Sequence, residues 1–76
     1  MQVTLCQNIY GDLICQVREV KEEIEKDYYH ILKRYIEKEY SVYSNYKIIG
    51  AYMLSEYKVV IQLYEEKTKS YTVVEI

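Results

Sequence analysis

The chain has 76 residues, a formal net charge of −2 and no proline, and half of its residues are apolar. This length predicts a single domain, residues 1–76, whose small core needs a disulfide, a metal or a partner subunit for good stability. The apolar content excludes a disordered chain. The nearly balanced charge disfavours strong electrostatic attraction to nucleic acid or to a membrane surface.

The sequence lacks the signals of membrane insertion and secretion. The longest apolar run, near Val59 to Leu63, is too short to cross a bilayer. The segment MQVTLCQNIYGD has no basic region followed by a long apolar block. We therefore expect a cytoplasmic protein, located in the host cytoplasm if a virus encodes it.

Residues 2–18 are expected to form a strand or a hairpin of two strands. Gly11-Asp12 is typical of a two-residue turn. In that register Cys6 and Cys15 are diagonal neighbours, about 7–8 Å apart, which is too far for a direct disulfide. We expect two reduced, partly buried cysteines. The alternative is a bridge of the kind that occurs in the cytosol of thermophiles.

Residues 19–40 are expected to form one long amphipathic helix. A second possible start, at Leu13, would make the helix about 40 Å long, whereas strands of this size reach only about 30 Å. A start near Glu19 matches the sheet, so the hairpin is favoured for the preceding segment. The apolar stripe of this helix, at steps of three and four residues, contains Val20, Ile24, Tyr28, Ile31, Leu32 and Tyr35.

Residues 46–76 are expected to form a three-stranded antiparallel meander with turns at Ser55-Glu56 and Lys67-Thr68. Gly50 then lies opposite Ile61, where a glycine indicates a bulge or the close approach of a packed element. The face under the helix is expected to carry Ile48, Tyr52, Leu54, Val59, Ile61 and Leu63.

These elements predict an α+β fold with two layers. A mainly antiparallel sheet of four or five strands has one long amphipathic helix on one face. The favoured order of elements is β-β-α-β-β-β, and the alternative is β-α-β-β-β.

The other face of the predicted sheet is aromatic and mostly apolar. Because one helix covers only one face, this patch would be exposed, and exposed aromatic patches are typical of protein interfaces. Tyr64 lies directly opposite Tyr71 in the predicted register. The sequence therefore predicts a partner-binding surface that consists of Tyr64, Tyr71, Ile49, Met53 and Val60.

No catalytic or metal-binding pattern is present in the sequence. His30 is the single histidine, and no nucleophile, orienting group or set of further ligands can be assigned to it. We expect no enzyme activity, no metal and no cofactor. The predicted function is a small non-enzymatic domain that binds a protein partner or forms a homodimer. By analogy of type, such compact chains are common among virus- or mobile-element-encoded modulators and inhibitors.

Two alternative functions use other residues. Tyrosines interleaved with lysines are the minimum equipment for stacking single-stranded nucleic acid, although the overall charge has the wrong sign. The candidate residues for this alternative nucleic-acid-binding site are Tyr43, Tyr46, Lys47, Lys67 and Lys69. A small-ligand pocket between helix and sheet, lined by tyrosine hydroxyls, is the other alternative.

Overall fold

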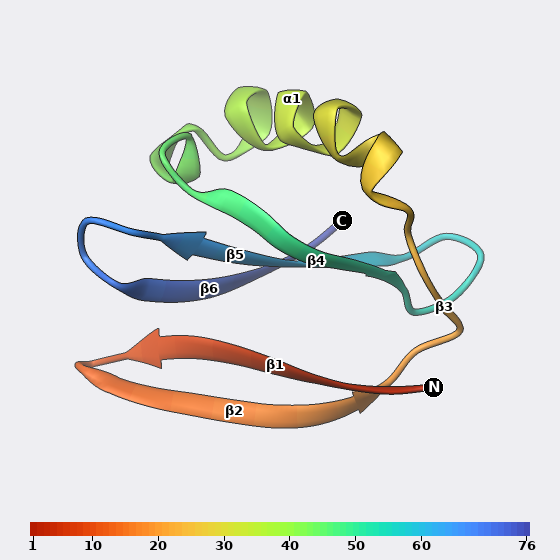
Figure 1. Ribbon diagram of the computed structural model, residues 1–76, viewed down its shortest axis with the longest axis horizontal. Helices are drawn as coiled ribbons and strands as arrows, with labels where there is room; N and C mark the ends of the chain where they lie inside the picture. Colours follow the sequence, from red (N-terminus) through yellow and green to blue (C-terminus); the bar gives the residue numbers. More distant parts are fainter.

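The computed structural model describes residues 1–76 and confirms the α+β class. The strands are β1 (Gln2–Ile9), β2 (Asp12–Glu19), β3 (Glu22–Glu23), β4 (Lys47–Met53), β5 (Val59–Glu65) and β6 (Ser70–Glu75). The helix α1 (Tyr29–Glu39) lies between the short 3-10 turns η1 (Lys26–Tyr28) and η2 (Ser41–Tyr43). The strands form two antiparallel sheets, a β1-β2 hairpin and a four-stranded sheet of order β3-β4-β5-β6. Helix and hairpin lie on opposite sides of the larger sheet (Figure 1).

The helix begins later than the sequence predicted. The short strand β3 pairs with the edge of β4, and the Ile24 N–H donates to the Ala51 carbonyl at 2.9 Å. The prediction of helix from residue 19 is therefore wrong up to residue 25, because pairing with β4 outweighs the helical propensity of the glutamates. The two glutamates of β3 also make this edge of the sheet unfavourable for pairing with another chain.

The buried side of α1 differs from the predicted stripe. Ile36 is fully buried and Leu32 packs beside it, whereas Tyr28, Ile31 and Tyr35 are exposed. Both sets of residues have helical spacing, so the sequence contains two apolar stripes. The stripe that includes Ile36 faces the sheet. The core beneath the helix consists of Ile36, Ala51, Ile61, Leu63 and Val74.

The pairing of β5 with β6 agrees with the predicted register. Ile61 lies opposite Val74, and Tyr64 lies opposite Tyr71. The pairing of β4 with β5 agrees only before residue 49, where a β-bulge shifts the register by one residue. After the bulge, every side chain of β4 faces the opposite side of the sheet from the predicted one.

The bulge changes the faces of the four residues of β4 that follow it. Gly50 lies opposite Gln62 rather than Ile61. Ala51, expected on the far face, is fully buried in the core beneath the helix. Tyr52, expected beneath the helix, pairs with Val60 and shares the far face with Gly50. Met53, expected on the far face, pairs with Val59 and lies on the helix side. The predicted faces of these four residues are therefore wrong.

Gly50 allows a tyrosine ring to lie close to the backbone. A β-carbon at this position would be 2.6 Å from the Tyr52 hydroxyl oxygen and 3.0 Å from two carbons of the ring. Burial raises the pKa of Tyr52, and the nearby Glu23 carboxylate adds to this rise. The bulge that the glycine indicated is therefore present, but the group that approaches Gly50 is Tyr52 of the same strand and not an element packed on the sheet.

A candidate interaction surface on the β1-β2 hairpin

Tyr10 and Gly11 form the turn of the hairpin. Both have positive φ, 50° and 86°, as a type I′ turn requires. The turn lies one residue before the predicted Gly11-Asp12 position, so the predicted register is wrong. In the observed register Cys6 lies directly opposite Cys15.

Cys6 and Cys15 form a disulfide, with Cα atoms 4.0 Å apart. The expectation of two reduced cysteines is therefore wrong, because it followed from the incorrect register. Closing a loop with a sequence separation of 9 stabilises the fold by about 2.5–3 kcal/mol in the chain-entropy model. The bridge is one of the reinforcements that a core of this size requires.

The edge of β1 holds the hairpin on the larger sheet. The Cys6 N–H donates to Gln62 Oε1 at 2.6 Å, and Gln62 Nε2 donates to the Cys6 carbonyl at 2.8 Å. Gln62 Nε2 also donates to the Thr72 carbonyl at 2.8 Å. The Tyr71 N–H donates to Asn8 Oδ1 at 2.6 Å. Gln62 is only 5% exposed. Its side-chain amide takes the place of the backbone groups that a neighbouring strand would offer to Cys6.

The hairpin covers part of the face that the sequence predicted to bind a partner. Val60 is fully buried, so it cannot contact a partner in this fold. Tyr64 and Tyr71 are half-buried, with ring centroids 4.7 Å apart. Met53 is half-buried on the helix side of the sheet, opposite Val59, and Ile49 is exposed at the bulge. The five predicted residues therefore do not form one continuous exposed patch.

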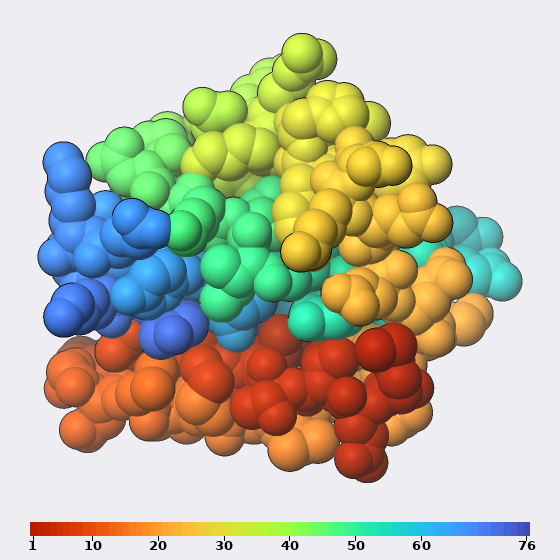
Figure 2. All heavy atoms as spheres, in the orientation of Figure 1, coloured from red at the N-terminus to blue at the C-terminus, as the bar shows by residue number.

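β2 is exposed along nearly its whole length. All its residues except the half-buried Arg18 are exposed, and its apolar side chains Leu13, Ile14 and Val17 are 53, 43 and 64% exposed. Its only ladder partner is β1, so its other edge is free. The hairpin, red and orange in Figure 2, forms one side of the molecular surface, with β2 outermost (Figure 1).

The direction of the backbone groups along β2 follows from two observations. The Cα atoms of Cys6 and Cys15 are 4.0 Å apart, which is nearer to the value of about 4.5 Å for a non-hydrogen-bonded pair than to the value of about 5.5 Å for a hydrogen-bonded pair. The Cys6 N–H and carbonyl accordingly point away from β2, toward Gln62. The N–H and carbonyl of Cys15 therefore point away from β1, and alternation places those of Leu13 and Val17 on the same free edge.

Tyr10 has an unusual conformation for its residue type. Glycine, asparagine and aspartate are favoured at positive φ, and an aromatic residue is unfavourable there. The Tyr10 side chain is fully exposed, so packing does not offset this cost. Residues that break a local preference without a structural benefit are expected at functional positions.

The residues of the alternative nucleic-acid site do not form a stacking platform. Tyr43 and Tyr46 form an edge-on pair with ring centroids 5.1 Å apart, and both pack against the core. Lys67 and Lys69 lie in the segment between β5 and β6. Lys47, the first residue of β4, forms an ion pair with Glu66. The rings of Tyr43 and Tyr46 are therefore engaged in packing within the fold.

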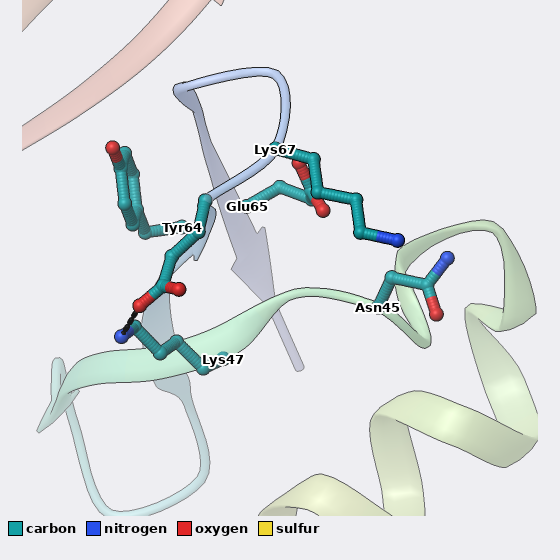
Figure 3. A pocket seen from close by; sticks show the side chains of 6 residues that line it. Asn45, Lys47, Tyr64, Glu65 and Lys67 are labelled. Carbon is teal, nitrogen blue, oxygen red and sulfur yellow. Dashed lines mark hydrogen bonds and ion pairs between the residues drawn. The ribbon is translucent and has the colours of Figure 1, made fainter.

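A shallow hollow of about 350 Å³ lies between the start of β4 and the β5-β6 turn (Figure 3). The Lys47 ammonium forms an ion pair with the Glu66 carboxylate, and this hydrogen bond raises the pKa of Lys47. Lys67 extends toward Asn45. Two lysines and two glutamates line the hollow, so their charges offset one another. Its lining residues are Asn45, Lys47, Tyr64, Glu65, Glu66 and Lys67.

The space between helix and sheet contains an open hollow of about 270 Å³. Tyr29 is the only tyrosine that lines it, together with His30, Lys33, Lys47 and Ile48. Burial raises the pKa of Tyr29, with further contributions from Glu23 and Tyr52. This hollow is therefore lined by one tyrosine hydroxyl, whereas the small-ligand alternative predicted a pocket lined by several.

Neither metal chemistry nor similarity to known proteins identifies a function. The structure places no group of three or more His, Cys, Asp and Glu side chains where they could hold a metal ion. None of its helices combines the length and the apolar content needed to cross a membrane. No protein-family model, curated protein or solved structure matches the chain.

Proposed function

We propose that the chain is a non-enzymatic protein-interaction domain that binds an extended segment of a partner protein along the free edge of β2. The observation that supports this function is the combination, on one strand, of an unpaired edge and exposed apolar side chains. In strand addition, main-chain hydrogen bonds provide affinity and alternate side chains provide specificity.

The contrast between β2 and the edge strand β3 supports this assignment. Proteins usually protect free edges with charges, proline or very short strands. β3 is two residues long and consists of glutamates, so it follows this rule. β2 is eight residues long and contains no proline, and its charged residues lie only at its two ends. The apolar side chains between them are exposed. An edge of this kind is an aggregation hazard unless a partner covers it.

Tyr10 provides a suitable anchor beside this edge. Tyrosine is enriched among the residues that dominate binding energy. Its ring projects from a tight turn and has only two side-chain torsions to restrict, so binding costs little conformational entropy. We therefore assign partner contacts to Tyr10, Leu13, Ile14 and Val17, in place of the half-covered Tyr64 and Tyr71.

A domain that binds in this way can inhibit or modulate a partner without any chemistry, as expected of a virus- or mobile-element-encoded protein. The Cys6–Cys15 disulfide bears on the compartment. Disulfides are rare in reducing cytosol and persist in oxidising compartments or in the cytosol of hyperthermophiles. If the compartment is cytoplasmic, the bridge therefore favours the cytosol of a thermophile.

Panning of a displayed library of extended peptides on the folded chain tests this function. We expect enriched peptides with alternating apolar residues, as strand pairing requires. Val17→Lys should abolish their binding, because an edge lysine opposes pairing. Val42→Lys is the matched control, since Val42 is also an exposed valine, 77% against 64% for Val17, and lies in η2.

Val17→Pro is the second variant. The Val17 N–H points to the free edge, so proline removes no hydrogen bond of the β1-β2 ladder and should leave the fold intact. Circular dichroism checks that it does. Peptides that bind the Val17→Pro variant as tightly as the original chain would contradict strand addition at β2.

A further inference from the structure

We infer that the segment bound along β2 is β2 of a second copy of this chain, antiparallel to the first and related to it by a two-fold axis at Cys15. This inference rests on the proposed function, because both use the same edge. It specifies a residue-by-residue register, which follows from the backbone directions and charges of β2.

The backbone directions restrict which registers two copies can adopt. Leu13, Cys15 and Val17 direct their N–H and carbonyl groups to the free edge, whereas the residues between them bond to β1. An edge residue of one copy must therefore face an edge residue of the other. In an antiparallel pair of identical strands, this condition places the two-fold axis on a residue and never between two residues.

The register with its axis at Cys15 joins complementary side chains. Asp12 of each copy lies opposite Arg18 of the other, and Leu13 lies opposite Val17. Symmetry repeats each pair, which gives two contacts between opposite charges and two between apolar side chains. Cross-strand pairs of both kinds stabilise antiparallel sheets.

The two neighbouring registers lack this complementarity. With the axis at Ile14, Asp12 faces Gln16 of the second copy. With the axis at Gln16, Leu13 faces Glu19 of the second copy. Neither register brings Asp12 to an arginine. Charge complementarity therefore selects the axis at Cys15.

The surroundings of β2 leave room for this arrangement. β2 is the outermost strand of the molecule (Figure 1), and both of its faces are exposed. The pairs at Leu13, Cys15 and Val17 each exchange two backbone hydrogen bonds with the second copy. The two hairpins then form one four-stranded sheet of order β1-β2-β2-β1. A sheet of this size is stable where an isolated hairpin is marginal.

A charge-exchange experiment tests the register. The association constant is measured by sedimentation equilibrium over a range of protein concentrations with the disulfide intact. Asp12→Arg and Arg18→Asp each place like charges opposite one another twice, so each variant should weaken the dimer by about 10- to 30-fold at low salt. The double variant Asp12→Arg/Arg18→Asp restores opposite charges and should recover most of the lost affinity.

Asp27→Arg is the matched control, because it makes the same charge change at an exposed position outside β2 and should leave the association constant unchanged. If the chain remains monomeric at a protein concentration of about 1 mM, its dissociation constant lies above that of even very weak binding. This result overturns the inference. So does a dimer that the double variant fails to restore. Neither result affects the peptide-binding test, in which equal binding to Val17→Pro would contradict the proposed function itself.

Discussion

Replacing Gln62 by leucine should loosen the attachment of the hairpin to the larger sheet. The leucine keeps most of the apolar volume but removes both hydrogen bonds to Cys6 and the one to Thr72. Each lost hydrogen bond costs about 0.5–1.5 kcal/mol, and a buried partner left unsatisfied costs about 1–3 kcal/mol. Because Cys6 is only half-buried, water can reach part of its backbone. We expect a destabilisation of about 2–4 kcal/mol.

This loss is large for a chain of 76 residues, whose total stability should be about 4–11 kcal/mol. A change of 1 kcal/mol shifts the Tm of such a domain by about 4–8 °C, so Gln62→Leu should lower it by about 10–25 °C. Urea and thermal denaturation followed by circular dichroism measure both quantities. Gln2→Leu is the control, because Gln2 is exposed on β1, and it should change stability by less than about 0.5 kcal/mol.

Hydrogen exchange identifies the cause of the destabilisation. In the Gln62→Leu variant the Cys6 amide should lose protection before the amides of β5 and β6 do. A destabilisation below about 1 kcal/mol, or a Cys6 amide that remains protected, would refute the role assigned to Gln62.

Gln62→Glu tests the same contact through pH. The carboxylate cannot donate to the Cys6 carbonyl, and burial should raise its pKa in the folded state. The protonated form fits the folded state, so the stability that the variant loses relative to the original chain should be smallest below the unfolded-state pKa near 4.3 and should grow as pH rises through the folded-state pKa. A flat difference between this variant and the original chain from pH 4 to 7 would contradict the burial of this site.

Three further predictions concern other parts of the chain. Gly50→Ala should cost about 1–2 kcal/mol by displacing the Tyr52 ring. In a Tyr52→Leu background the same change should be neutral or stabilising by up to about 1 kcal/mol, and urea denaturation of the original chain, the two single variants and the double variant would reveal the coupling. The hydrogen bond from the Thr68 N–H lowers the pKa of Glu65. The stability that Glu65 contributes is therefore present above its ordinary pKa and is lost as pH falls through the folded-state pKa. Glu65→Gln should remove this dependence, so the urea midpoint of the variant should change less than that of the original chain between about pH 5 and 3. Tyr10→Asn should stabilise the turn by about 0.5–1 kcal/mol and weaken peptide binding, whereas unchanged binding would show that the ring is no anchor.

The sequence predicted the parts of the fold in which local signals agree. The turn between β5 and β6 contains lysine and threonine between two β-branched segments, and the resulting register is correct through Tyr64 and Tyr71. The order of the long strands and the helix is also correct. Elements of this kind follow from periodicity and turn composition, which act over a few residues.

The errors arose where one residue decides the arrangement. A turn with Tyr10 at positive φ has no sequence signal, because its favoured residues are asparagine, aspartate and glycine. A one-residue error there separates Cys6 from Cys15. The bulge at Ile49 likewise reverses the faces of the residues that follow it. The exposed edge of β2 could have been suspected from Leu13, Ile14 and Val17, since their spacing places apolar side chains on both faces of a strand.

The disulfide gives the hairpin a covalent continuity that does not depend on its tip. Cys6 and Cys15 lie on either side of the Tyr10–Gly11 bond, and Tyr10 is fully exposed. A protease that cuts after Tyr10 would therefore yield two polypeptides that stay joined until a reductant is added. New sequence can be inserted at this bond with both strands still tethered, which makes the tip a suitable position for a reporter or a label.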